Sequence, residues 1–286
     1  MLTDHAPLAA IFAQGLIDAG WDIGYDVTIV RRNGSPTGDR WGVAARELRA
    51  QAVNAILAGD YEAARAAREV TDATPIVAVD VEHDPILSGF ARTLGRPGGN
   101  VTGLFCDFGD AMTQLTRALR EALPTLRPLV ALTDGATTQV QVHALREAGA
   151  PLGFDVDTLA WATGRADGLV DRVAASRAGL VVLSSPPLAE EAARLAKRAA
   201  RRKVPSAGAF IRYAQAGGLL ARGPSLPDAF RRAAAMVDRV LRGARVADIP
   251  IERPPRFELV LNAKTAATLE VMLPANLVSN ADYVLR

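Results

Sequence analysis

The stretch TPIVAVDVEHDPILSGFARTLGRPGGNVTGLFCD, residues 74–107, predicts much of the architecture of this chain. It contains two mostly apolar runs, Ile76–Val79 and Val101–Phe105, which are too short for helices and are typical of buried strands in a parallel sheet. Polar residues follow each run, beginning with Asp80 and Cys106. Because ligands of open α/β sheets bind beyond the carboxyl ends of the strands, this pattern predicts a binding cleft.

The rest of the chain continues this alternation of short strands and amphipathic helices. Strands are expected at residues 27–30, 54–58, 128–133, 154–159, 179–183, 204–207 and 257–262, and helices at 8–19, 41–52, 140–148, 169–176, 189–202 and 226–241. Such alternation favours an α/β protein with parallel, doubly wound sheets. The second series, beyond residue 107, predicts a second lobe built like the first.

Composition excludes several functional classes. The chain has 286 residues, enough for two lobes of ordinary domain size, and a formal net charge of +2, too small to indicate nucleic-acid binding. The basic run from Arg194 to Lys203 places its charges on one helical face, which favours a solvated surface. Cys106 is the only cysteine, so an intrachain disulfide is excluded, and no apolar run is long enough to span a membrane.

Two motifs carry a resemblance to a known family. RPGGNVTG, residues 96–103, and AGGLLARGPSLPDAFRRAAAMVDRVLRGARVADIPIERPPRFELVLNAKTAATL, residues 216–269, resemble the substrate-binding proteins of ABC importers, some of which bind aromatic amino acids. The resemblance extends from about Phe12 onward. It implies a two-lobe periplasmic-binding-protein-like fold whose chain crosses between lobes three times, near Gly103, Gly223 and Pro254. The N-lobe would comprise residues 1–104 plus 223–253, and the C-lobe 105–222 plus 254–286.

The same resemblance implies a function. A protein of this type captures a small molecule, here expected to be an amino acid or aromatic acid, in the interlobe cleft and delivers it to an ABC permease. It would act as a monomer, without cofactor or metal, in the periplasm or cell envelope, although residues 1–12 lack the features of a secretory signal. The alternative is a ligand-sensing module of a regulatory or signalling protein. An enzyme is not expected, because no nucleotide fingerprint, metal cluster or catalytic triad is recognisable.

The resemblance also implies a strand ahead of the first helix, and no such strand is expected in this chain. The expected consequence is unpaired backbone and exposed apolar surface around a central position of the sheet, and therefore low stability. The sequence predicts a start codon upstream of Met1, with the first strand and a signal peptide before it.

Three candidate ligand-binding residues follow strands of the N-lobe. Asp84 precedes Pro85, and its carboxylate would accept the ammonium group of an amino acid; the alternative is an Asp-Pro turn. Asp60 and Tyr61 lie between a strand and a helix, where Asp60 serves either the ligand or the helix as its N-cap. Tyr61 would stack on an aromatic ligand. His83 is expected at the cleft edge, not in a metal site.

The other candidates lie at the first crossing and in the C-lobe. Cys106 and Asp107 end the strand after RPGGNVTG; Cys106 is expected as a small cleft or core residue, because no partner base for a nucleophile is recognisable. Ser184 and Ser185 end one C-lobe strand, and Gly208 and Phe210 follow another. Phe210 is expected either as an aromatic wall of the cleft or as a packing residue.

Overall fold

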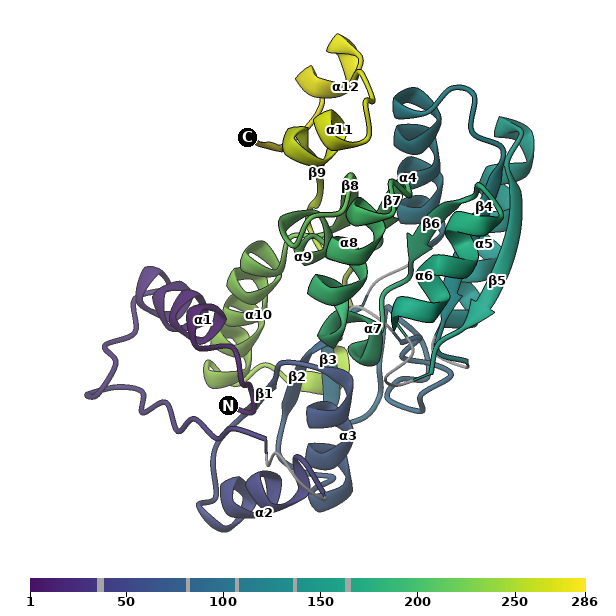
Figure 1. Ribbon diagram of the computed structural model, residues 1–286. Coiled ribbons are helices and arrows are strands. Elements are labelled where there is room, and N and C mark those ends of the chain that lie inside the picture. The colour runs from purple at the N-terminus through teal and green to yellow at the C-terminus, as the bar shows by residue number, and fades with distance from the viewer. Residues whose placement is uncertain (35–38, 81–82, 106–107, 136–137, 163–165) are drawn as a thin grey trace. The chain divides into compact units, whose positions relative to one another are not determined.

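The computed structural model describes residues 1–34, 39–80, 83–105, 108–135, 138–162 and 166–286, which form two α/β units (Figure 1). Unit 1 comprises Met1–Cys106 and Ser225–Arg256, and unit 2 comprises Asp107–Pro224 and Phe257–Arg286. Each unit is therefore assembled from two separate stretches of the chain.

Unit 1 is built on a parallel sheet with the strand order β1-β2-β3, in which Ala78 of β2 pairs with both Ala58 and Gly103. The strands are β1 (Ile56–Ala58), β2 (Ile76–Asp80) and β3 (Val101–Phe105), and the helices are α1 (Ala6–Asp18), α2 (Gly42–Ala50), α3 (Tyr61–Val70) and α10 (Leu226–Leu241), followed by a short 3₁₀ turn at Val246–Asp248. All three strands are buried throughout, as the apolar runs predict.

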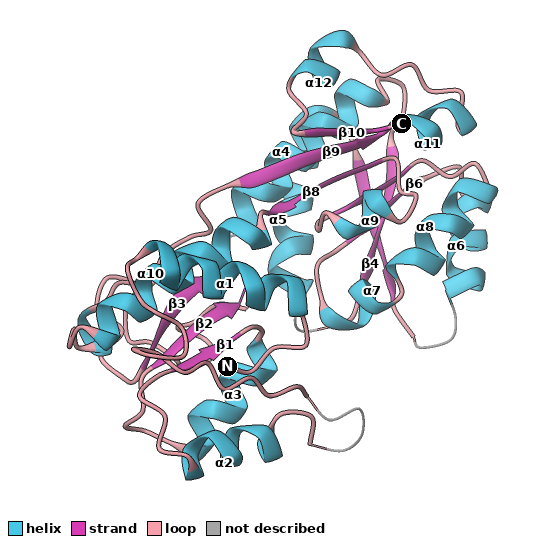
Figure 2. Cartoon of the chain, turned by 90° about the vertical axis from the view of Figure 1, so that its left-hand side faces the viewer, coloured by secondary structure: helices cyan, strands magenta, loops and turns pink. Residues whose placement is uncertain are grey.

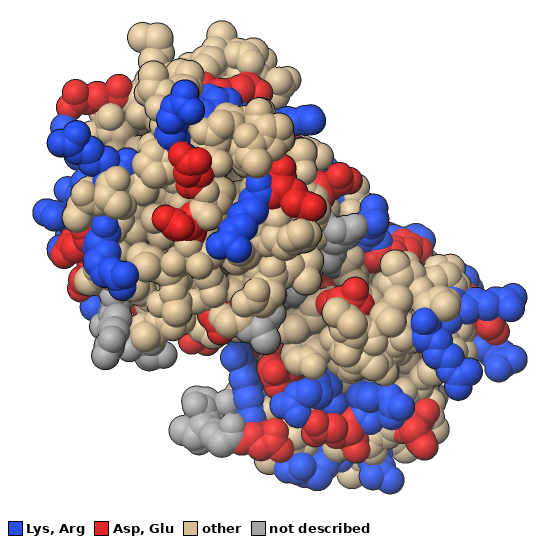
Figure 3. Space-filling model, turned by 90° about the vertical axis from the view of Figure 1, so that its right-hand side faces the viewer, with Lys and Arg blue, Asp and Glu red and all other residues tan. Residues whose placement is uncertain are grey.

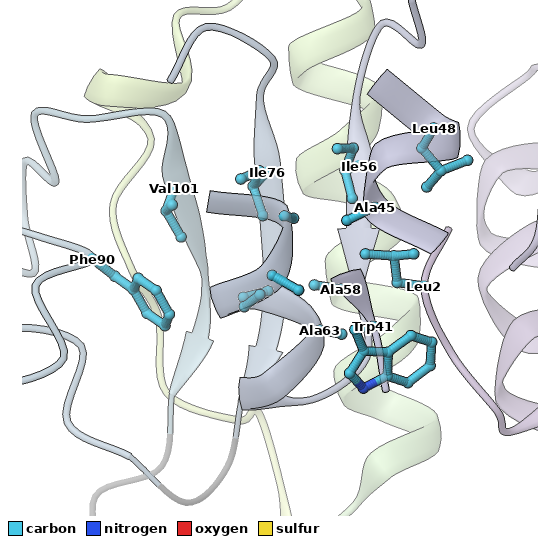
Figure 4. Close-up of a cluster of buried hydrophobic side chains, with 14 of the residues drawn as sticks. Leu2, Trp41, Ala45, Leu48, Ile56, Ala58, Ala63, Ile76, Phe90 and Val101 are labelled. Atoms are coloured by element: carbon cyan, nitrogen blue, oxygen red, sulfur yellow. The ribbon is translucent and has the colours of Figure 1, made fainter. Parts of the chain in front are cut away.

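Helices cover both faces of this sheet, and each face has its own apolar core. On one face α2 and α3 pack against the strands through residues such as Leu48, Ala63 and Ile76, in the cluster drawn in Figure 4. On the other face α1 and α10 pack through Phe12, Phe230 and others against Val77 and Leu104. Successive residues of a strand point to opposite faces, so an apolar run such as residues 76–79 is buried on both.

The RPGGNVTG motif is a structural element of unit 1. The Asn100 side chain donates to the carbonyls of Thr71 and Thr74, both at 3.0 Å, and the Thr102 hydroxyl donates to the carbonyl of Ile249 at 2.8 Å. Gly103 has φ +146°, and a Cβ there would lie 2.0 Å from the carbonyl oxygen of Ala78 in the neighbouring strand. The motif thus joins β3 to the loop before β2 and to the segment after α10.

The segment expected as a strand at residues 27–30 makes only isolated bridges. Its neighbour is Met1–Thr3, in which Leu2 bridges Arg32 on one side and Ala58 on the other, both in parallel orientation. Ahead of α1 the described residues form no regular strand, but residues 1–3 occupy a strand position beside β1. Because the neighbouring segment Met1–Thr3 is so short, residues 27–30 lack a partner with which to form the continuous series of backbone hydrogen bonds of a regular strand.

Unit 2 is built on a larger sheet with the order β10-β9-β8-β7-β6-β4-β5. Figure 2 shows α4 and α5 on one side of it and α6 and α8 on the other. The strands are β4 (Pro128–Thr133), β5 (Asp155–Ala160), β6 (Gly179–Val182), β7 (Ser206–Gly208), β8 (Leu220–Pro224), β9 (Phe257–Asn262) and β10 (Tyr283–Leu285). The helices are α4 (Phe108–Ala122), α5 (Gln139–Gly149), α6 (Ala166–Ala175), α7 (Pro186–Glu190), α8 (Ala192–Arg201), α9 (Arg212–Gln215), α11 (Ala263–Thr268) and α12 (Ala275–Ser279), with a 3₁₀ turn at Ala150–Leu152.

One pair of strands departs from the parallel pattern. β8 and β9 are antiparallel, with Arg222 opposite Leu259, whereas the other paired strands of the described sheets are parallel. The chain leaves unit 2 at Pro224, the end of β8, and returns at Phe257, the start of β9. Because Pro224 pairs with Phe257, the returning strand must run in the opposite direction.

The basic helix is divided, and several of its charges are paired. The structure has α7 and α8 in place of one helix at 189–202, and Arg194 and Arg198 of α8 form ion pairs with Asp167 and Asp171 of α6, at 2.8 and 2.6 Å. Acidic and basic side chains are interspersed on the face drawn in Figure 3. No helix of the described residues is long and apolar enough to cross a membrane.

Candidate functional site

The first group of candidate residues follows β1 in unit 1. Asp60 has extended backbone and its carboxylate accepts a 2.7 Å hydrogen bond from the N–H of Ala63, which makes it the N-cap of α3. Burial raises the pKa of the Asp60 carboxyl above its ordinary value, and the Ala63 bond offsets part of that rise. The N-cap interpretation of Asp60 is therefore confirmed, and its side chain is already engaged within the protein.

Tyr61, the first residue of α3, contributes to an aromatic cluster. Its ring stacks on the imidazole of His83, with centroids 3.8 Å apart and planes 19° from parallel. Phe90 packs against Tyr61 from another direction, with its ring centroid 5.6 Å away. These rings come from the residues after β1 and after β2, so parallel strand ends bring them together.

Asp80, the last residue of β2, orients the imidazole. Its carboxylate accepts from the backbone N–H of His83 at 3.3 Å and lies 3.2 Å from the ring Nδ1. Asp80 is 2% exposed, so this contact is shielded from water and holds the ring in place. The result is an aromatic surface, fixed by a buried carboxylate, at the carboxyl edge of the unit 1 sheet.

Asp84 is exposed and forms a turn. Its Oδ1 accepts hydrogen bonds from the N–H groups of Ile86 and Leu87, at 2.7 and 3.0 Å. This geometry matches the Asp-Pro turn interpretation, and the role of Asp84 in ligand binding stays a prediction. Cys106 and Asp107, the candidates after β3, lie outside the described residues.

In unit 2 the candidates after β6 are held by a side-chain clamp. The Gln141 amide of α5 donates to the carbonyl of Ser184 at 2.6 Å and accepts from the Ser184 N–H at 2.7 Å. Both residues are buried. Because a carboxamide satisfies one donor and one acceptor together, it fixes the backbone where β6 passes into α7.

Ser185 follows at the N-cap position of α7 and is fully buried. Its hydroxyl has no hydrogen-bond partner among the described residues, and the same holds for Oδ1 of Asp134, which follows β4. β4 and β6 are parallel neighbours, so both groups belong to the same edge of the sheet. A buried polar group without a partner is costly, and such groups call for an explanation such as a bound molecule.

The remaining unit 2 candidates follow β7. Phe210 is half-buried and packs edge-on against Tyr213, with ring centroids 6.1 Å apart. Gly208 is buried, and a Cβ there would lie 2.4 Å from the Cβ of Tyr213. The absence of a side chain at Gly208 is thus explained by Tyr213, while direct contact with ligand stays a prediction for both candidates.

The sequence matches the profile of the family described as "ABC transporter substrate binding protein" over residues 3–285. The chain belongs to this family. The match spans both units, including the two motifs recognised in the sequence.

Three individual proteins similar to this substrate-binding protein are 21–23% identical to it in sequence. A tyrosine-binding protein of Clostridioides difficile (strain R20291) is 23% identical over 269 residues, 91% of this chain and 75% of that protein. The fold also matches an ABC domain of Streptococcus pneumoniae solved in complex with L-Trp, at TM-score 0.88 and 21% identity over 99% of this chain and 97% of that one. A ligand-free, open substrate-binding protein with adhesive properties from Clostridium difficile matches at TM-score 0.78 and 23% identity, with the same coverage.

Sequence reasoning proposed Tyr61 as a ligand contact, which stays a prediction, and did not anticipate its ring partners His83 and Phe90 in this substrate-binding protein. His83 was expected only at the edge of the site, Asp80 was noted only as a polar residue at a strand end, and Phe90 and Gln141 were not considered as site residues. The position of His83 three residues after Asp80 was a usable signal, because a carboxylate at a strand end reaches that far. Gln141 contacts Ser184 across 43 positions, and no local pattern indicates such a contact.

Proposed function

We propose that this protein captures an aromatic amino acid and delivers it to an ABC permease outside the cytoplasm. Membership of the substrate-binding family supports the transport role. The observation that carries the ligand class is the Tyr61–His83 stack at the carboxyl edge of the unit 1 sheet, with centroids 3.8 Å apart. Aromatic side chains favour aromatic ligands, because offset and edge-on ring contacts add to simple apolar burial.

Two further observations support this ligand class. The imidazole is oriented by Asp80, so the stack is preformed and loses little entropy when a ligand binds. The relatives point the same way, since one is described as tyrosine-binding and another was solved with L-Trp.

Calorimetric titration of the purified protein with L-Trp, L-Tyr and L-Phe tests the proposal, with L-Leu, L-Lys and a hexose as comparisons. We expect saturable binding of at least one aromatic amino acid and weaker or no binding of the others. Tyr61→Ala should weaken binding at least about two- to tenfold, because an aromatic contact contributes roughly 0.5–1.5 kcal/mol and the lost apolar burial adds to it. Tyr61→Phe should retain most of the affinity.

Tyr25→Ala is the matched control, since Tyr25 is 88% exposed and is not among the rings that contact Tyr61 or His83. Binding of a different class of small molecule, unaffected by Tyr61→Ala, would remove the aromatic assignment but keep the capture role. No binding of any compound by a cooperatively melting protein would remove both. Uptake of the bound amino acid by cells with and without this protein tests delivery to a permease.

A further inference from the structure

Two arginines meet at the amino edge of the unit 2 sheet, the edge opposite to the one that carries the candidate ligand residues. Arg127 directly precedes β4, and Gly153 lies two residues before β5. Because β4 and β5 are parallel, with Pro128 paired to Asp155, the segments that precede them lie side by side. Arg120, in the last turn of α4, reaches the same place. The pocket formed there has a volume of about 480 Å³ and is lined by Arg120, Pro124, Thr125, Arg127, Leu152 and Gly153.

The guanidinium group of Arg120 is held in place by the protein. Its Nη1 donates to the carbonyls of Pro124 and Leu126, at 2.9 and 2.7 Å. The central carbon of the group lies 3.8 Å from the ring centroid of Phe154, which is buried. These contacts engage one nitrogen and one face of the group and leave Nη2 near Gly153. A donor that is already oriented loses little entropy when a ligand binds.

Gly153 keeps the space between the two guanidinium groups open. Its φ is +75°, and a Cβ there would lie 3.9 Å from Nη1 of Arg127 and 4.0 Å from Nη2 of Arg120. Both charged nitrogens therefore lie within 4.0 Å of one point, and no side chain fills it. A ligand beside this point can accept hydrogen bonds from both groups.

No acidic side chain is paired with these two charges in the part of the chain that the structure describes. The acids nearest along the sequence are Glu121, which accepts from Asn276 at 2.8 Å, and Asp155, which forms no ion pair with either arginine. Burial and the nearby charge of Arg127 lower the pKa of Arg120 below its ordinary value, as expected for two cations that repel each other. A bound anion would remove this repulsion.

We propose that Arg120 and Arg127 form a binding site for a phosphate monoester group, carried either by a small phosphorylated compound or by a lipid headgroup. Guanidinium groups bind phosphate through charge-assisted and often paired hydrogen bonds. Two positive charges match the nearly double negative charge of a phosphate monoester better than the single charge of a carboxylate. Pro124 and Leu152 offer apolar contact to the organic part of such a ligand. The site does not depend on the proposed capture of an amino acid.

Two substitutions of Gly153 test the arrangement of charge within the protein. Gly153→Asp and Gly153→Asn introduce side chains of nearly the same shape, and both residue types tolerate positive φ. Only the aspartate supplies a negative charge between the two guanidinium groups. We expect it to melt about 2 °C or more above the asparagine variant at low ionic strength, with a smaller difference at high salt. Equal melting temperatures at low salt would contradict the convergence of the two charges.

A second experiment measures ligand binding directly. Glycerol phosphate is titrated calorimetrically, and sedimentation is measured with phosphatidylcholine vesicles that contain or lack phosphatidate. Arg127→Gln, at an exposed position, should weaken binding about tenfold, because a hydrogen bond to a charged group is lost. Arg172→Gln is the matched control, since it removes an exposed arginine from α6, on the other side of the sheet.

The two ligands distinguish the two sources of phosphate. Saturable binding of glycerol phosphate that is weakened by Arg127→Gln assigns the site to small phosphorylated compounds. Binding of only the vesicles with phosphatidate, again weakened by Arg127→Gln, assigns it to a lipid headgroup. The proposal is overturned if the parent protein binds neither ligand, or if Arg127→Gln and Arg172→Gln weaken binding equally.

Discussion

Substitution of Gly103 by alanine is the sharpest test of how β2 and β3 pack. A Cβ at this position would lie 2.0, 2.6 and 2.8 Å from the carbonyl oxygen, nitrogen and carbonyl carbon of Ala78. These are backbone atoms of the paired strand, so no change of rotamer relieves the contact. On its other side Gly103 accepts a 2.9 Å hydrogen bond from Glu252, which prevents β3 from moving away freely.

The expected loss of stability follows from these contacts. Holding a non-glycine residue in a sparsely populated backbone conformation costs about 1–3 kcal/mol. Separating the strands locally also loses one or two ladder hydrogen bonds, at about 1 kcal/mol each. We therefore expect Gly103→Ala to lower the free energy of unfolding of unit 1 by about 2–5 kcal/mol, a large part of the stability of a typical domain.

Urea denaturation followed by tryptophan fluorescence measures this loss. Of the three tryptophans, Trp21 and Trp41 belong to unit 1, so a Trp161→Phe background makes the signal report on unit 1 alone. Gly95→Ala is the matched control, because a Cβ there has no atom within 4 Å. A Gly103→Ala protein within about 0.5 kcal/mol of its parent would refute the reasoning about the β2–β3 contact.

Three further predictions concern buried or paired polar groups. Gln141→Leu should lower the urea-denaturation free energy of unit 2 by about 2–3 kcal/mol, because Ser184 loses two buried hydrogen bonds; an unchanged midpoint would contradict the clamp. Arg232 lowers the pKa of Glu252, so the stability from this pair is present above the ordinary glutamate pKa and is lost as the pH falls through the lower folded value. Since the pair is partly exposed, Arg232→Met should reduce the loss of stability below about pH 4.5 by under about 1 kcal/mol. A pH dependence of stability identical to that of the parent would contradict a contribution from this pair. Burial lowers the pKa of the Met1 amine to about 5, so between about pH 5 and pH 8 the unfolded amine is protonated and the folded amine is not. The free energy of unfolding of unit 1 should therefore increase as the pH rises from about 5 to about 8, by up to about 4 kcal/mol. Acetylation of the amine should abolish that increase.

The fold was predictable because its signals are local. Apolar runs such as residues 76–79 and 128–133 predict β2 and β4. Successive residues of a strand point to opposite faces, so a strand buried on both faces needs apolar residues at consecutive positions. Asp60 was recognised as an N-cap because capping involves a contact only three positions away. The antiparallel β8–β9 pair was not predicted, because its direction depends on where the chain re-enters unit 2.

The candidate site was predictable in position but less so in its contacts. Strand ends predicted Tyr61 as a candidate in the unit 1 sheet and Ser185 as a candidate in the unit 2 sheet, because ligands of open α/β sheets bind beyond the carboxyl ends of the strands. The stack of Tyr61 on His83 and the clamp of Gln141 on Ser184 depend on how separate elements pack in three dimensions. No periodicity or spacing in the sequence encodes such contacts, which is why they emerge only from the structure.

The assembly of each unit from two stretches of chain has a consequence for synthesis on the ribosome. Val77 and Leu104 of the unit 1 sheet are covered by α10, whose first residue Leu226 lies 121 positions after Phe105, the last residue of β3. At about 5–20 residues per second, α10 is made roughly 6–24 s after that sheet has been translated. During this interval the nascent chain carries an apolar sheet face that lacks its α10 cover, so its yield should depend on translation rate and on chaperones that bind extended apolar segments.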